Sequence, residues 1–187
     1  MSDVARQRWF QFLGADKDAR VRLFGIPYAG GGASIFRPWA ELLPAPVQLC
    51  PVQLPGREWR IKETPATRMD DLVGALAEAV DPYTDLPFGL FGHSLGALVA
   101  FELARRLESE GKPPVHLFVS GHRAPQIPTS DRKLHQVPDS LFLMELRRLQ
   151  GTPEEVLQNP ELMRLIAPVL RADFEMAETY EFKEGPI

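Results

Sequence analysis

The residues best suited to chemistry in this sequence form one short motif with a serine at its centre. The motif reads Gly92-His93-Ser94-Leu95-Gly96. It follows a short apolar run at 88–91 and precedes a long helical pattern. A G-x-S-x-G sequence between a strand and a helix is typical of a nucleophile elbow, in which a sharp turn holds the serine hydroxyl above a sheet. We therefore predict that Ser94 is a nucleophile that attacks a carbonyl carbon.

The two glycines of the motif have a steric reason. A β-carbon at Gly92 or Gly96 would collide with the neighbouring strand or helix. The helix begins beneath Ser94, so its free N–H groups and the positive end of its dipole face any developing oxyanion. A plain glycine-rich turn between a strand and a helix is the alternative, and the strong elements on both sides favour the elbow.

A second glycine-rich segment follows the first predicted strand, at 21–26. It reads Tyr28-Ala29-Gly30-Gly31-Gly32-Ala33-Ser34. A phosphate cradle is one interpretation, but the segment contains neither G-x-x-x-x-G-K-[ST] nor G-x-G-x-x-G. In a hydrolase with an elbow, the loop after an early strand supplies a second oxyanion donor from its backbone. We expect that role here, with a plain flexible turn as the remaining alternative.

Strands and helices alternate around these two segments. We predict strands at 21–26, 47–54, 88–91 and 115–120, and an edge strand at 9–13. We predict helices at 35–43, after a capping box at 67–70, and directly after the elbow. The alternation predicts an α/β fold, a mostly parallel sheet with helices on both faces. Sites in such sheets lie at the carboxyl ends of strands, where Ser94, the Ala29 segment and the turn at 121–123 would meet.

The composition sets limits on the class of protein. A chain of 187 residues with a net charge of −4 is expected to be one soluble domain whose main partner is neither nucleic acid nor a membrane. The start of the chain lacks the apolar core of a signal peptide, and Cys50 is the only cysteine. These observations predict a cytoplasmic protein. Cys50 is interpreted as a small core residue, because no elbow surrounds it.

The texture changes after Pro125. Three helices are predicted, at 139–149, 153–157 and 161–180, with Pro160 and Pro168 at or near breaks. They do not resume the alternation of strands and helices. We therefore interpret 1–125 as the core of the fold and 126–182 as a helical lid over the site.

The chain resembles the type II thioesterases of polyketide and non-ribosomal peptide synthesis over nearly its whole length. Four segments carry the resemblance: Ile26-Pro27-Tyr28-Ala29-Gly30-Gly31, Val52-Gln53-Leu54-Pro55-Gly56-Arg57-Glu58, Phe91-Gly92-His93-Ser94-Leu95-Gly96-Ala97 and Ser120-Gly121-His122-Arg123-Ala124-Pro125. The second is the most specific, because G-x-S-x-G alone occurs in many hydrolases. The resemblance implies an α/β-hydrolase fold with a helical lid.

The resemblance also implies a substrate and residue roles. The substrates would be acyl or peptidyl thioesters on the phosphopantetheine arms of carrier proteins, whose hydrolysis clears stalled or misprimed synthases. Ser94 would be the nucleophile, and the backbone N–H groups of Leu95 and Ala29 would form the oxyanion hole. No cofactor or metal is needed. Carrier proteins tend to be acidic, so cations near the site are docking candidates, although each singly is more simply a solvated side chain. These candidates are Arg57, Arg60, Arg123, Arg147 and Arg148.

The acid and the base of a triad are not found in the sequence. This fold supplies them in the order serine, acid, histidine. The histidines are His93, His116, His122 and His135, and the acids between Ser94 and His135 are Glu102, Glu108, Glu110 and Asp131. No pair of them is expected at the ends of later strands. We therefore expect a C-terminal segment of the same protein, beyond residue 187, to carry the remaining core strands with the acid and the base.

Two other functions remain open from the sequence. One is a serine carboxylesterase of the same fold that acts on small esters. The other is a catalytically inactive module that binds a carrier protein, since a serine without a base is a weak nucleophile.

Overall fold

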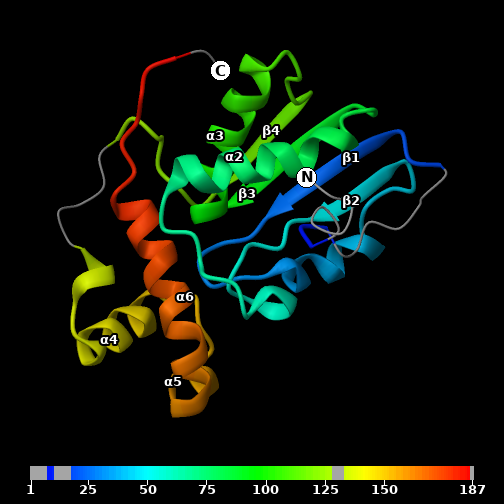
Figure 1. Ribbon diagram of the computed structural model, residues 1–187. Helices are drawn as coiled ribbons and strands as arrows, with labels where there is room; N and C mark the ends of the chain where they lie inside the picture. The colour runs from blue at the N-terminus through cyan, green and yellow to red at the C-terminus, as the bar shows by residue number, and fades with distance from the viewer. Residues whose placement is uncertain (1–7, 11–17, 128–132, 186–187) are drawn as a thin grey trace.

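The centre of the protein is a parallel sheet (Figure 1). The computed structural model describes residues 8–10, 18–127 and 133–185 of the chain. The strands are β1 (Val21–Ile26), β2 (Val47–Pro51), β3 (Phe88–His93) and β4 (His116–Ser120). Their order is β2-β1-β3-β4, and every neighbouring pair is parallel. The predicted α/β class is thereby confirmed.

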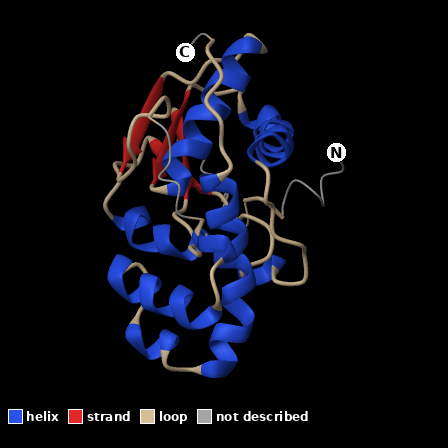
Figure 2. Cartoon of the chain, turned by 90° about the vertical axis from the view of Figure 1, so that its left-hand side faces the viewer, coloured by secondary structure: helices blue, strands red, loops and turns tan. Residues whose placement is uncertain are grey.

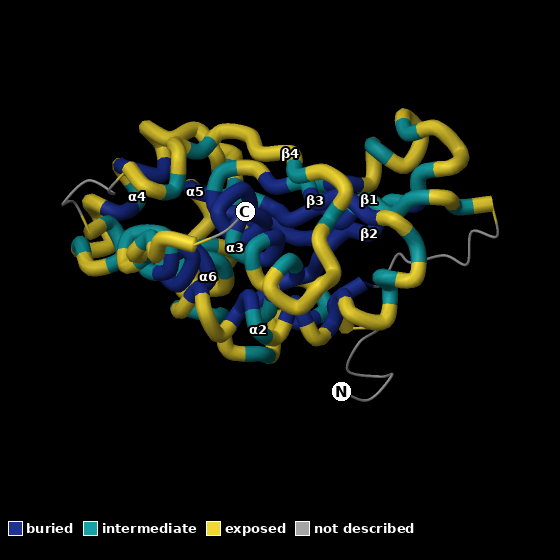
Figure 3. Tube along the Cα trace, turned by 90° about the horizontal axis from the view of Figure 1, so that it is seen from above, coloured by how far each residue is buried: buried dark blue, intermediate teal, exposed yellow. Residues whose placement is uncertain are grey.

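One face of the sheet is covered by two α-helices, α2 (Met69–Val80) and α3 (Leu95–Ser109). The register places Phe24 of β1 beside Leu90 of β3, and neither side chain is exposed. Both belong to the main hydrophobic core together with the inward faces of α2 and α3. Figure 3 shows the central strands largely in the colour of buried residues, beside these helices.

The start of α2 differs from the prediction. The capping box at 67–70 is not formed: the N-cap is Arg68, which makes no side-chain capping bond. Asp70 and Asp71 lie in the first turn instead. Their negative carboxylates interact favourably with the positive end of the helix dipole, so this charge interaction stabilises the N-terminus of α2 in place of a capping hydrogen bond.

The opposite face is covered in part by η1 (Ala33–Glu41), a 3₁₀ helix that was predicted as an ordinary helix at 35–43. Pro38 lies inside it, and a proline cannot donate a backbone hydrogen bond. Two aromatic rings of η1 pack on Phe91 of β3: the ring centroid of Phe36 lies 6.1 Å from that of Phe91, and the centroid of Trp39 lies 4.7 Å from it. Farther along this face β4 is open: Phe118 is 47% exposed.

The segment after β4 forms a separate helical layer. It contains η4 (Leu134–Gln136), α4 (Asp139–Leu149), α5 (Glu154–Leu157) and α6 (Pro160–Glu178). These helices pack around a small core of their own, made of Phe142, Leu146, Leu157 and Leu170. Figure 2 shows them gathered below the sheet.

Helix α6 joins this layer to the rest of the molecule. It runs without interruption through Pro168, so the predicted break there is wrong. Met176, near its C-terminal end, is 1% exposed and belongs to the main core. One helix therefore belongs to both hydrophobic cores. Figure 1 shows α6 running from the helical layer towards the level of the sheet.

A few smaller differences from the predicted elements remain. Trp9 lies in a turn and Phe10 follows it outside any strand, and both side chains are buried; the rest of the predicted edge strand, 11–13, lies outside the described residues. Strand β2 ends at Pro51 rather than at residue 54. Two short 3₁₀ helices, η2 (Glu58–Arg60) and η3 (Asp81–Tyr83), complete the elements. None of the helices in the described part of the chain is long and apolar enough to cross a membrane.

Candidate active site

Ser94 lies on the sharp turn between β3 and α3, as the motif predicts. Its backbone is strained, with φ 53° and ψ −119°, in a region that side-chain-bearing residues rarely occupy. The Ser94 N–H donates to the carbonyl oxygen of Ser120 at 2.8 Å, which ties the turn to the end of β4. Such backbone strain persists only where the surrounding structure enforces it. A strained serine on a sharp turn between a strand and a helix is typical of a nucleophile elbow.

The glycines of the motif allow the turn to close. A β-carbon at Gly92 would lie 2.0 Å from the carbonyl oxygen of Gly96, and one at Gly96 would lie 2.2 Å from the carbonyl oxygen of Ile26. Both distances are far inside van der Waals contact. Leu95 is the first residue of α3, so its N–H group lies where a helix has no acceptor of its own.

The segment after β1 lies against the same turn. Gly96 packs on the end of β1, and the ring of Tyr28 meets that of His93 edge to face with centroids 6.0 Å apart. The structure therefore brings the Ala29 segment beside the elbow, at the carboxyl ends of β1 and β3. The roles of Ser94, Leu95 and Ala29 in catalysis stay predictions.

The histidines near the sheet are used locally. His93 Nδ1 lies 3.1 Å from the hydroxyl of Ser120, so its ring points towards β4. His122 Nδ1 lies 2.8 Å from the backbone oxygen of Arg123, and the ring of His116 packs at a tilt against that of Phe118, with centroids 4.3 Å apart. Within the described part of the chain, Ser94 Oγ has no hydrogen-bond partner. Asp131 lies outside the described residues.

His135 has an acidic partner that the sequence did not suggest. Its Nδ1 lies 2.5 Å from Glu178 Oε2, and both side chains are less than a tenth exposed. The same carboxylate accepts the backbone N–H groups of Leu134 and His135 at 2.9 and 3.3 Å. All three of these contacts lie between η4 and the end of α6, so the pair joins these two helices.

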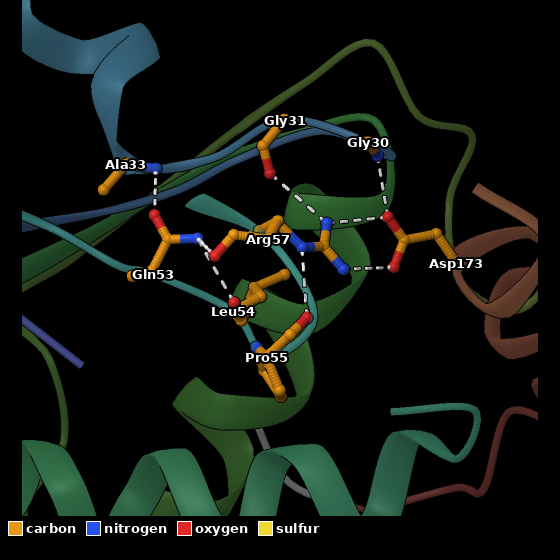
Figure 4. A network of polar contacts seen from close by, with 8 residues as sticks. All are labelled: Gly30, Gly31, Ala33, Gln53, Leu54, Pro55, Arg57 and Asp173. Carbon is orange, nitrogen blue, oxygen red and sulfur yellow. Dashed lines mark hydrogen bonds and ion pairs between the residues drawn. The ribbon is translucent and has the colours of Figure 1, made fainter. Parts of the chain in front are cut away.

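The most specific family segment forms a buried polar network (Figure 4). Arg57 and Asp173 make two hydrogen bonds of 2.8 Å each, and their side chains are 7% and 0% exposed. Gln53, with no exposed surface, lies in the same network. Asp173 was missed from the sequence, although a signal was present: it falls four residues after the buried Val169, on the apolar face of α6. A charged residue on such a face indicates a buried partner.

Two of the five predicted docking candidates, Arg57 and Arg60, are wrong because the structure buries them. Arg57 and Arg60 are 5% and 7% exposed, so they cannot meet a carrier protein. Arg60 instead packs over the ring of Trp9 at 4.1 Å and binds Glu63. Arg123 is exposed. Arg147 and Arg148 are largely exposed on α4, where they pair with Glu154 and Glu145.

One cavity among the described residues lies away from the elbow. It has a volume of about 820 Å³ and lies between α2, α3 and the segment after α6. Its walls include Asp70, Glu102, Arg105 and Tyr180, but neither Ser94 nor the Ala29 segment. Burial, followed by the hydrogen bond to Glu102, raises the pKa of Tyr180. Because neither Ser94 nor the Ala29 segment lines this cavity, we assign it no part in the chemistry at Ser94.

Comparison with known proteins decides the family. Residues 21–186 match the thioesterase domain family. The chain belongs to that family. The gramicidin S biosynthesis protein GrsT of Aneurinibacillus migulanus is 48% identical over 177 residues, which cover 94% of this chain and 69% of GrsT. Thioesterase PikA5 of Streptomyces venezuelae is 44% identical over 92% of this chain and 62% of PikA5.

Solved thioesterase structures agree with the fold. RedJ, the thioesterase from the prodiginine pathway of Streptomyces coelicolor, superposes with a TM-score of 0.83 at 42% identity, over 91% of this chain and 68% of RedJ. The predicted α/β-hydrolase fold and the resemblance to type II thioesterases are thus confirmed. This thioesterase chain spans roughly two thirds of the length of each of these three relatives.

Proposed function

We propose that the protein hydrolyses acyl or peptidyl thioesters held on the phosphopantetheine arms of carrier proteins, and so clears stalled or misprimed synthases. The observation that carries the proposal is Ser94, held at φ 53° on the elbow with Leu95 at the start of α3 and the Ala29 segment beside it. Type II thioesterases, one of them from an NRPS/PKS biosynthetic pathway, are among the similar solved structures, which supports this substrate class. We place this work in the cytoplasm, in keeping with the single cysteine.

The proposed reaction has two stages. Ser94 Oγ attacks the thioester carbonyl carbon while a base accepts the hydroxyl proton, and the N–H groups of Leu95 and Ala29 stabilise the oxyanion. Collapse of the tetrahedral intermediate breaks the C–S bond, and the arm leaves as a thiol after protonation. Water then attacks the acyl-serine by the same route, which releases the carboxylic acid and regenerates Ser94.

We further propose that the acid and the base come from a segment beyond residue 187. Ser94 Oγ lacks a partner among the described residues. Strand β4 lies at one end of the described sheet, and Phe118 and Val119, on its two opposite faces, are 47% and 60% exposed, which leaves room for further core structure. The test compares residues 1–187 with the protein from the complete gene. A fluorophosphonate probe should label Ser94 rapidly in the longer protein and at least about a hundredfold more slowly in the shorter one, since activation by a base contributes about 10²–10⁴. Equal labelling would contradict this assignment.

Turnover tests the substrate class. The complete protein should release acyl groups from a loaded carrier protein, and Ser94→Ala should abolish release. Ser120→Ala is the matched control, because Ser120 lies at the end of neighbouring β4 and binds His93. A preference for small free esters over carrier thioesters would favour the carboxylesterase. Carrier binding without turnover would favour the inactive module, an alternative that remains because Ser94 Oγ has no partner among the described residues.

A further inference from the structure

Helix α6 of the lid reaches the Ala29 segment through one buried carboxylate. Asp173 Oδ2 accepts the backbone N–H of Gly30 at 2.7 Å. Both carboxylate oxygens also bind the guanidinium of Arg57, at 2.8 Å each (Figure 4). The contact is tight, because a β-carbon on Gly30 would lie 2.6 Å from the side chain of Leu170, one turn earlier on α6. The lid helix thus touches the residue next to Ala29.

The Ala29 segment, 28–34, is called the oxyanion loop below. Residues 53–58 hold this loop from its other side. Gln53 Oε1 accepts the N–H of Ala33 at 2.8 Å, and Arg57 Nη1 donates to the carbonyl oxygen of Gly31 at 3.2 Å. Glu58 accepts the N–H of Ser34 at 3.3 Å.

Together with Asp173, these contacts fix backbone groups of four residues in the loop: Gly30, Gly31, Ala33 and Ser34. The N–H of Ala29 differs from these groups. Among the residues that the structure describes it has no acceptor. An oxyanion hole requires a donor that is aimed and left free while its surroundings are held rigid.

Burial of the Arg57–Asp173 ion pair carries a large desolvation cost. Burying a carboxylate and a guanidinium costs desolvation that their attraction only partly repays, so apolar residues of similar volume would often be as stable. A bidentate pair instead fixes distance and orientation. The ion pair here fixes the relative positions of three groups, because the Asp173 carboxylate binds both the Arg57 guanidinium and the Gly30 N–H.

We propose that Asp173 is a positioning residue through which the lid helix sets the oxyanion loop, with Arg57 as its relay to the segment 53–58. The inference rests on the proposed function, in which the N–H of Ala29 stabilises the oxyanion. A shift of α6 that parts Asp173 from Gly30 therefore releases the loop beside Ala29. The chemical step at Ser94 becomes dependent on the position of the lid, without any lid residue touching the reacting atoms.

The test is Asp173→Asn in the protein from the complete gene, which removes the charge that holds Arg57 and keeps the shape. The matched control is Arg171→Gln on the same helix. Arg171 donates to the backbone oxygen of His135 and to Asp139, both in the lid. We expect kcat for a carrier thioester to fall about 10–100-fold in Asp173→Asn with KM changed by less than about threefold, because a misplacement of about 1 Å can cost about 10²-fold. Arg171→Gln should stay within about threefold of the unsubstituted protein.

A second readout does not depend on turnover. In hydrogen–deuterium exchange, the amide of Gly30 should exchange at least about tenfold faster in Asp173→Asn, and at an unchanged rate in Arg171→Gln. If Asp173→Asn does not fold, Arg57→Lys keeps the charge, loses the bidentate geometry and should shift both readouts in the same direction.

Unchanged exchange and kcat in Asp173→Asn would overturn the inference, and so would equal effects in Arg171→Gln. Were the unsubstituted protein to hydrolyse no thioester, the proposed function would fail, whereas the exchange rates would still decide whether Asp173 holds the loop.

Discussion

Gly96 and Ile26 lie so close that the elbow and the end of β1 form one packed unit. A β-carbon on Gly96 would come within 2.2 Å of the carbonyl oxygen of Ile26 and 2.6 Å of that of Pro27. Both neighbours are backbone atoms, which cannot turn aside as a flexible side chain can. The strained turn at Ser94 is therefore possible only because residue 96 has no side chain.

Gly96→Ala should lower the free energy of unfolding by about 3 kcal/mol, the upper part of the range for overpacking, because backbone must shift to admit the methyl group. The measurement is the midpoint of urea unfolding, with the m-value as a check on two-state behaviour. Gly74→Ala is the control. Gly74 lies inside α2 with open space around it, so alanine should stabilise the protein by about 0.5–1 kcal/mol through helix propensity. A Gly96→Ala protein as stable as Gly74→Ala would contradict the steric argument.

Gln53 gives a second prediction about the scaffold of the site. Its Oε1 accepts from Ala33 N–H, and its Nε2 donates to the carbonyl oxygens of Leu54 and Arg57 at 3.2 and 3.1 Å. Gln53→Leu keeps the volume and leaves these buried groups unpaired, so the free energy of unfolding should fall by about 2 kcal/mol.

The control for this change is Gln158→Leu. Gln158 is exposed and its side chain donates to the exposed Glu154, so its substitution should change the free energy of unfolding by less than about 0.5 kcal/mol. Equal effects of the two substitutions, measured by urea unfolding, would show that burial of Gln53 does not matter.

These contacts mark the limit of what the sequence could predict. Ser94 and its glycines were predictable because an elbow is local: the strand, turn and helix are consecutive, and the steric demand falls on residues two positions from the serine. The Arg57–Asp173 pair joins residues 116 positions apart; helical periodicity places Asp173 on the apolar face of α6 but does not identify Arg57 as its partner. Arg57 was therefore interpreted as a surface cation, whereas the structure buries it. The uninterrupted α6 likewise depends on packing that outweighs the intrinsic cost of Pro168.

Cys50 should be chemically silent. It lies in β2 with no exposed surface, and burial raises the pKa of its thiol to about 12, with the Arg22 charge opposing the shift weakly. At pH 8 about one thiol in ten thousand is then ionised, and the thiolate is the reactive form. Iodoacetamide should leave the folded chain unmodified in an hour and add one group per chain in 8 M urea, as mass spectrometry can measure. Rapid modification of the folded chain would mean that Cys50 is neither buried nor a simple core residue.

The pair of His135 and Glu178 offers the last prediction, because it is an acid–histidine pair that could be mistaken for part of a triad. The structure places it between η4 and the end of α6, with Glu178 also holding two backbone N–H groups of η4. A structural role predicts that His135→Gln lowers the thermal midpoint by several degrees, as a loss of about 1 kcal/mol would in a chain of this size. It also predicts that labelling of Ser94 by a fluorophosphonate stays within about threefold of the unsubstituted protein.

Glu178→Gln should follow the same pattern, because the amide oxygen still accepts one N–H while the charged partner of His135 is lost. A catalytic base behaves differently: its removal slows labelling by about 10²–10⁴ whatever the change in stability. A loss of that size in His135→Gln, with an unchanged thermal midpoint, would make His135 the base. It would also remove the need for a histidine beyond residue 187.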